Sequence, residues 1–153
     1  MKKVFSYEFN KLGRLWIAEE DCKLVKISFS EISGCEFKET EFIKEVKKQL
    51  DEYFSGKREK FNLPLAPSGT EFQKKVWNAL TKIPYGKTCS YQDIACEIGN
   101  PNACRAVGMA NNKNPIAIII PCHRVVGKNG GLTGYAGGLG IKKVLLDIEK
   151  KDS

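Results

Sequence analysis

The sequence predicts an α/β (α+β) fold in two parts: a small strand-and-helix domain over residues 1–66 and an α-rich domain with a helix-turn-helix over residues 67–153. Three observations support this prediction. Short β-branched and aromatic runs fill the first third, helical periodicities dominate the rest, and a stretch containing Pro, Ser and Gly, residues 62–69, separates them. With 153 residues, of which 42% are hydrophobic, the chain can build a core as one domain or as one domain plus a small appended module.

The first third is expected to contain strands and then a helix. Three segments are short and rich in β-branched and aromatic residues: 4–9, 12–18 and 24–29. Glu20-Asp21 can turn a hairpin between the last two. A helix that ends before Gly56 is expected over residues 41–54, where apolar side chains recur at helical spacing: Ile43, Val46, Leu50 and Tyr53. No chemical motif occurs here, so we interpret this part as a scaffold.

Two helices with capping boxes are expected next. The first box is Ser68-Gly-Thr-Glu71, and the helix it opens has one apolar stripe: Phe72, Val76, Leu80 and Ile83. The second box is Ser90-Tyr-Gln-Asp93, and its shorter helix also has one stripe: Tyr91, Ile94, Ala95 and Ile98.

A third helix is expected after the turn at Gly99-Asn100, with Pro101 in its first turn. Its stripe is made of small residues: Ala103, Ala106, Val107 and Ala110. Two short helices around a turn that contains glycine predict a helix-turn-helix. Arg105 points about 150° away from this stripe, and it shares the outer face with Gly108 and Asn112. Such a face can approach DNA closely; the alternative is an ordinary solvated arginine.

The remaining segments are expected to form a strand, two turns and a helix. The apolar run 116–120 fits a strand that is buried on both faces. Glycine-rich sequences at 129–131 and 137–138 indicate turns. The last helix, about residues 139–151, is expected to bury four apolar side chains: Ile141, Val144, Leu145 and Ile148.

Positive charge is concentrated in the second part of the chain. Residues 1–66 hold 13 Lys/Arg and 12 Asp/Glu, whereas residues 67–153 hold 12 and 6, so nearly all of the net charge of +7 lies there. This distribution fits a surface for a polyanion such as DNA, and the alternative is a basic surface that serves solubility. The longest apolar run has five residues, too few for a membrane span, and no secretion signal is recognised. The protein is therefore expected to be cytoplasmic, without a membrane partner.

The six cysteines are not expected to form a disulfide framework, since they are not clustered and the chain is long enough to build a core without disulfide bonds. No Cys-x-x-Cys occurs and His123 is the only histidine, so neither a metal site nor another cofactor is expected. Most cysteines are interpreted as small buried hydrophobic residues.

Cys122 is followed by the chain's only histidine, at the end of its most apolar segment. A thiol of ordinary pKa is only about 3% ionised at neutral pH, and a basic neighbour that lowers the pKa to ~6 would make it about 90% thiolate. Arg124 adds a nearby positive charge. Adjacent residues of a regular strand point to opposite faces, so either Pro121 breaks the strand or a water relays the proton. The alternative is a buried structural cysteine beside a surface histidine.

The block from Gly69 to Glu149 resembles the O6-alkylguanine-DNA alkyltransferases, also called methylated-DNA–protein-cysteine methyltransferases. The segments that carry the resemblance lie in the family's order and spacing: Ile83-Pro-Tyr-Gly-Lys-Thr88, Arg105-Ala-Val-Gly108, Asn114-Pro115, Ile120-Pro-Cys-His-Arg-Val125 and Gly134-Tyr-Ala-Gly-Gly-Leu139. The Pro-Cys-His-Arg-Val segment is highly specific. Residues before about 60 match only in general character.

The resemblance implies a single-turnover reaction in which Cys122 takes the alkyl group from O6 of guanine in double-stranded DNA, with no cofactor. His123 is then the base, acting through a water, and Glu149 holds it. Asn114 steadies the segment that carries Cys122. Tyr135 donates to the guanine ring, which leaves as an anion.

The resemblance also implies a pocket and a DNA surface. Val125, Tyr135 and Ala136 belong to the pocket, and many relatives carry Ser where this chain has Ala136. DNA contacts are implied for five residues: Arg105, Tyr91, Ala106, Gly108 and Arg124. The target base must leave the duplex, and Arg105 fills its place from the minor groove. Tyr91 crowds a phosphate or, as its stripe position also allows, belongs to the core. The protein is expected to act as a monomer.

Three other functions are compatible with parts of the pattern. A protein that only binds alkylated bases would not need Cys122, and a helix-turn-helix regulator would not need Cys122, His123 and Glu149 together. A cysteine hydrolase would turn over and would have no use for Arg105.

Overall fold

The computed structural model describes residues 2–127, 135 and 138–150. The chain divides into two compact units, Met1–Ser68 and Gly69–Ser153, and each is described by itself. None of the helices in the described part of the chain combines the length and the apolar character that crossing a membrane requires.

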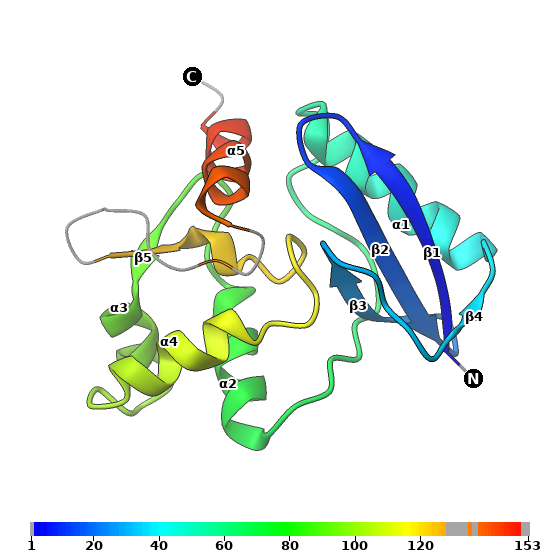
Figure 1. Ribbon diagram of the computed structural model, residues 1–153. Coiled ribbons are helices and arrows are strands. Elements are labelled where there is room, and N and C mark those ends of the chain that lie inside the picture. Colours follow the sequence, from blue (N-terminus) through cyan, green and yellow to red (C-terminus); the bar gives the residue numbers. More distant parts are fainter. Residues whose placement is uncertain (1, 128–134, 136–137, 151–153) are drawn as a thin grey trace. The chain divides into compact units, whose positions relative to one another are not determined.

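The first unit has a four-stranded sheet in the order β3-β2-β1-β4 (Figure 1). Its strands are β1 (Lys3–Phe9), β2 (Gly13–Glu20), β3 (Lys23–Ser28) and β4 (Glu36–Phe37). β1, β2 and β3 pair antiparallel, and the short β4 pairs parallel with β1. The three expected strands are confirmed. The hairpin turn lies at Asp21-Cys22, one residue later than expected, with φ of 53° and 59°, since the favoured two-residue hairpin turn takes positive φ at both positions.

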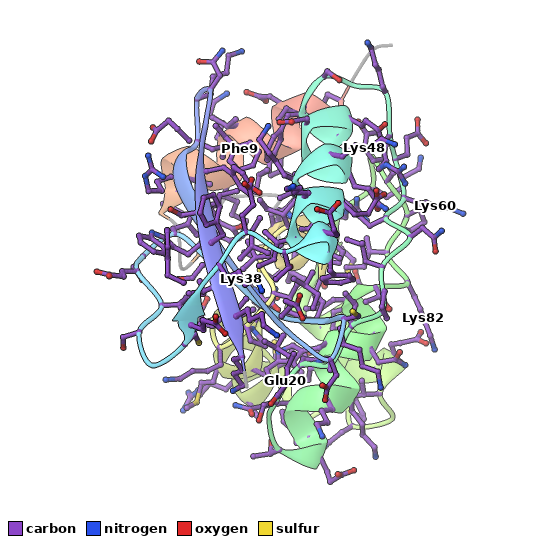
Figure 2. All side chains as sticks on the ribbon, turned by 90° about the vertical axis from the view of Figure 1, so that its right-hand side faces the viewer. Phe9, Glu20, Lys38, Lys48, Lys60 and Lys82 are labelled. Atoms are coloured by element: carbon purple, nitrogen blue, oxygen red, sulfur yellow. The ribbon has the colours of Figure 1, made fainter. Side chains whose placement is uncertain are left out.

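Helix α1 (Glu41–Phe54) packs on the sheet and confirms the expected helix (Figures 1 and 2). Thr40 caps it by accepting a hydrogen bond from the Ile43 amide. All four residues of the expected stripe are fully buried, as are Leu15 and Ile17 of β2. Lys48 lies on the exposed side of the same helix (Figure 2). The unit therefore has one core between sheet and helix.

The second unit is rich in helices: α2 (Glu71–Leu80), α3 (Tyr91–Glu97), α4 (Cys104–Asn112) and α5 (Leu139–Glu149). The first three pack against one another (Figure 1). The indole of Trp77 on α2 donates a 2.9 Å hydrogen bond to the Ala110 carbonyl on α4. Gly69 permits the chain to pass this ring, because a Cβ there would lie 2.5 Å from it. The unit also contains a short parallel pair, β5 (Cys89–Ser90) and β6 (Val125–Val126), and a 3-10 turn at Cys122–Arg124.

The expected helix-turn-helix corresponds to α3 and α4, with corrections at the helix starts. The Ser90–Asp93 capping box is confirmed, but α2 is capped by Thr70 and Gln73 rather than by Ser68 and Glu71. Pro101 lies in the turn before α4 and not in its first turn, and Ala103 provides no side-chain cap. The buried stripe of α4 is Val107, Ala110 and Asn111, while Ala106 is exposed. Asn111 belongs to the buried face, where its amide donates to the Cys122 carbonyl at 3.5 Å.

The apolar run 116–120 is buried, but the expectation of a strand there is wrong. Its backbone folds into turns, with Ile119 donating to Ala117, Ile120 donating to Ile116, and Ile118 at a φ of 74°. Pro115 and Pro121 flank the run and lack the N–H that a ladder requires. Four of its five residues are therefore buried in a segment made of turns, and Ile119 is half-buried.

Helix α5 buries a different stripe from the expected one. Its buried residues are Lys142, Leu145 and Glu149, while the other three expected residues are only partly covered: Ile141, Val144 and Ile148. The expected turn at 129–131, and Gly137 of the other, lie outside the described residues.

All six cysteines are free thiols. The interpretation of most of them as buried hydrophobic residues is wrong, because only Cys122 is buried. Cys22 and Cys96 are exposed, and the other three are half-buried. Cys22, for example, occupies the hairpin turn, which lies at the surface.

Candidate active site

Cys122 opens a single 3-10 turn, Cys122–Arg124, directly after Pro121. Its side chain is only 5% exposed. The Asn114 amide donates to the Sγ atom at 3.1 Å and to the Ile120 carbonyl at 2.8 Å, and its oxygen accepts from the Ile116 amide at 3.0 Å. Asn114 thus makes hydrogen bonds to both the apolar turn segment and the sulfur atom.

His123 is fully buried and bonds Glu149 on α5, with 2.7 Å between Nε2 and Oε2. Because the carboxylate only accepts, Nε2 carries the proton and Nδ1 carries the lone pair. Among the described residues Nδ1 has no hydrogen-bond partner. Successive side chains of a 3-10 turn diverge by about 120°, so the side chains of Cys122 and His123 leave the turn in different directions. Pro121 does not break a strand here, because the run 116–120 before it already folds into turns.

The Glu149 carboxylate is shared by two cationic or potentially cationic neighbours. Besides His123, it accepts two bonds from the Arg124 guanidinium, at 2.8 and 2.9 Å. The third nitrogen of Arg124 donates to the Ile83 carbonyl at 2.7 Å. An anion at a helix C-terminus is disfavoured, and this two-pronged charge-assisted pairing offsets the penalty.

Gly86 brings the turn after α2 against the end of α5. Its amide donates to Glu149 Oε1 at 3.4 Å, its φ is 79°, and a Cβ there would lie 3.2 Å from the Glu149 carbonyl oxygen. Both the left-handed backbone and the close approach therefore favour glycine at this position.

Lys142 is a residue of the site that the sequence analysis did not identify. It is fully buried on α5, and its ammonium donates to the Val125 carbonyl at 2.6 Å. Its charge interacts favourably with a Cys122 thiolate. The available signal was its position three residues before Leu145 and seven before Glu149, on one helix face.

The pKa of the Cys122 thiol is raised to about 11, chiefly because burial disfavours the thiolate. The Asn114 hydrogen bond and the Lys142 charge act in the opposite direction but do not compensate. The lowered thiol pKa that a basic neighbour could produce is therefore not found in the resting protein, and the cation that does favour the thiolate is Lys142 and not Arg124. Burial also lowers the pKa of His123, so its imidazole is neutral at pH 7 and able to accept a proton.

Val125 and Tyr135, which the resemblance assigns to the pocket, lie near Lys142 and near Cys122 respectively. Val125 is fully buried, and its carbonyl accepts from Lys142. Burial and the proximity of Cys122 raise the pKa of Tyr135, so its phenol stays protonated and is a donor. Ala136 lies outside the described residues.

The residues implied to bind DNA separate into two groups. Arg105 and Ala106 are exposed on α4, Gly108 is half-buried, and a Cβ on Gly108 would lie 3.8 Å from the half-buried ring of Tyr91. Arg124 differs, because its guanidinium is buried against Glu149 and Ile83. The structure therefore does not support the expected contact between Arg124 and DNA.

Both parts of the chain match one protein family. Residues 71–151 match the 6-O-methylguanine DNA methyltransferase, DNA binding domain, and residues 6–67 match the 6-O-methylguanine DNA methyltransferase, ribonuclease-like domain. The chain belongs to the 6-O-methylguanine DNA methyltransferase family.

Individual relatives agree with this assignment. The methylated-DNA–protein-cysteine methyltransferase of Methanosarcina acetivorans is 63% identical over 109 residues, which are 71% of this chain and 70% of the relative. The constitutive enzyme of that name from Bacillus subtilis is 50% identical over 149 residues, or 91% and 90% of the two chains. The crystal structure of Mycobacterium tuberculosis OGT in complex with DNA matches with a TM-score of 0.91 and 42% identity, covering 97% of this chain and 92% of that one.

Proposed function

We propose that this protein repairs DNA by transferring the alkyl group of O6-alkylguanine to Sγ of Cys122, once per molecule. The observation that supports this most directly is the buried set of Cys122, His123 and Glu149, in which the imidazole is fixed by a carboxylate and keeps a lone pair on Nδ1. The family assignment supports the same reaction.

The first chemical requirement is removal of the thiol proton. A thiol with a pKa of about 11 is only about one part in 10⁴ ionised at pH 7, so unassisted ionisation is inefficient. In our proposal, Nδ1 of His123 accepts the proton through a water, and Glu149 stabilises the imidazolium that forms. Lys142 and the Asn114 amide stabilise the thiolate.

The second step is an in-line displacement. A carbon–sulfur bond forms as the bond between that carbon and O6 breaks, and the electron pair stays on the guanine, which leaves as an anion. The protonated phenol of Tyr135 stabilises this anion by donating a hydrogen bond. The thioether product is too stable to reverse, so each molecule acts once. The reaction requires no cofactor.

The DNA part of the proposal concerns the outer face of α4. In this proposal α4 enters the minor groove, and Arg105 fills the space left by the extruded nucleotide. Support comes from the exposed position of Arg105 and from the excess of cations over residues 67–153. The protein acts as a monomer in the cytoplasm, where unpaired cysteines remain reduced.

The direct test of the proposed function is a mass measurement. After incubation with a duplex that contains O6-methylguanine, the peptide with Cys122 should gain one methyl group, with at most one per protein. Turnover beyond one equivalent, or a methyl group on another residue, contradicts the proposal.

Arg105→Ala is expected to slow repair of duplex DNA by about 100-fold or more. Extrusion of the base costs a few kcal/mol, and the variant no longer offsets that cost by filling the vacated space. Reaction with free O6-benzylguanine should change less than twofold, because the free base needs no extrusion. Single-turnover rates on both substrates measure this. Lys113→Ala, just after α4, is the control for loss of a single nearby cation. Equal losses on both substrates for Arg105→Ala indicate instead a role in the fold or pocket.

Methylation of Cys122 is expected to lower the thermal midpoint by about 5 °C. The thiol is nearly fully buried, so an added methyl group overpacks its surroundings, which costs about 1–3 kcal/mol. The Asn114 amide also loses a good acceptor. Melting curves of free, methylated and benzylated protein at one pH and salt concentration measure the effect. An unchanged or raised midpoint after methylation shows that the pocket has room for the product.

A further inference from the structure

Met109 is a large apolar side chain on the surface of α4. It is 67% exposed, and the other large hydrophobic residues of comparable exposure in the described chain are Phe37 and Leu139. It follows Arg105 by four residues, so the two side chains lie on the same helix face one turn apart. A single exposed apolar residue needs no explanation by itself, so the inference depends on what surrounds it.

The helix around Met109 has little charge. Arg105 is the one charged residue within Cys104–Asn112, and no acidic residue occurs there. A solvated surface helix normally has charged residues along its outer face. Here the outer face consists of a cation, small side chains and a methionine, whereas the net charge over residues 67–153 is strongly positive. Arg and Met are both enriched in interfaces, where charged residues are otherwise depleted.

Gly108, which lies between Arg105 and Met109, supports a close approach by a partner. A glycine inside a helix is destabilising relative to alanine. The fold does not require it, since its φ is not positive and a Cβ would make only ordinary contact with the Tyr91 ring. Because Gly108 has no side chain, the backbone of α4 is accessible beside Met109. A partner can therefore approach the backbone closely at this point.

We propose that Met109 inserts into the DNA minor groove one helical turn from Arg105, and that Gly108 permits the backbone approach which this insertion requires. The proposal rests on the DNA-repair function proposed above and assigns a second contact to it. Methionine is among the apolar side chains that proteins insert between base steps from the minor groove. Met109 then helps to unstack the duplex, while Arg105 occupies the vacated position.

The test compares Met109→Ala, Met109→Gln and Met109→Leu with Phe37→Ala, which removes an exposed apolar side chain from the other unit. Binding is measured on an O6-methylguanine duplex in a Cys122→Ser background, so that no transfer occurs. We expect Met109→Ala and Met109→Gln to weaken binding about tenfold, since a methionine side chain is no longer buried against the bases. Met109→Leu should retain most of the affinity, and Phe37→Ala all of it.

Salt dependence separates this contact from an electrostatic one. The slope of log Kd against log salt concentration should be the same for Met109→Ala and the parent, because no phosphate contact is lost. Arg105→Ala, which removes a cation, is the comparison for a changed slope. A 2-aminopurine beside the lesion should be less fluorescent in the Met109→Ala complex, because the neighbouring step remains stacked.

Several outcomes overturn the proposal. The first is an unchanged duplex affinity in both Met109→Ala and Met109→Gln. The second is a loss of reaction with free O6-benzylguanine when Met109→Ala is made in protein that keeps Cys122. Concentration-dependent self-association that Met109→Ala removes without affecting DNA binding also overturns it, since Met109 then contacts a second copy. If the Cys122 protein neither binds nor repairs the duplex, the proposed function itself fails, and this result is distinct from a failure confined to Met109.

Discussion

Cys122→Ser is expected to reduce alkyl transfer by at least about 10⁴-fold while duplex binding persists. Losses of this scale follow removal of the nucleophile from a catalytic relay. A hydroxyl is a much weaker nucleophile than sulfur at neutral pH, and the same environment that raises the pKa of the thiol also disfavours an alkoxide. The helix-turn-helix is not altered by this change. The measurement is single-turnover transfer from radiolabelled O6-methylguanine duplex, with binding measured in parallel.

Cys89→Ser is the matched control. Cys89 is a half-buried thiol in the same unit, and burial likewise raises its pKa to about 11. It lacks the hydrogen bond that Asn114 makes to Cys122. Transfer should stay within twofold of the parent. Repair that survives in Cys122→Ser, or that is lost equally in Cys89→Ser, shows that the nucleophile has been assigned wrongly.

Glu149→Gln is expected to cost about 3–5 kcal/mol of stability and to slow transfer about 100-fold or more. The stability loss follows because the change leaves the Arg124 guanidinium buried without its counter-charge. Transfer slows because the imidazolium of His123, which forms when the thiol proton is accepted, has no anion beside it. Chemical denaturation and single-turnover kinetics at a temperature where the variant is folded measure the two effects.

The double variant Arg124→Met, Glu149→Gln separates the two roles of Glu149. Replacing both partners of a buried ion pair by neutral groups is much less costly than removing one, so most of the stability should return. Transfer should remain slow, because the double variant still lacks the carboxylate beside His123. Recovery of transfer together with stability contradicts a role for Glu149 in the reaction and assigns it to folding alone.

Three of the four strands and the one helix described in the first unit were predictable because local pattern and burial agree there, whereas the two-residue β4 was not predicted. The stripe from Ile43 to Tyr53 has a single regular period, and every member is buried. The Ser90–Asp93 capping box was likewise predictable, since its hydrogen bonds join residues three apart. Such features depend on neighbours in the chain, and the sequence displays them directly.

Prediction failed where hydrogen bonds from individual side chains, near or far in the chain, decide the structure. The run 116–120 has the composition of a buried strand, yet Asn114 binds its backbone at both ends and the run folds into turns. The buried stripe of α5 includes Lys142 and Glu149, because the Val125 carbonyl and Arg124 provide partners that helical periodicity cannot reveal. The direction of the shift in the thiol pKa could not be predicted either, since it depends on how far burial outweighs the nearby Lys142 charge.

The sequence by itself determined the family, the nucleophile candidate and the order of the helices, because these depend on residue identity and short spacing. Only the tertiary structure decided that Arg124 is buried against Glu149 instead of being available to DNA, and that Lys142 lies at the reaction site. The physical reason is that a buried charge is tolerated only when a partner is within bonding distance. Here the partners, such as Gly86 and Glu149 at a separation of 63 residues, come together only when the chain folds.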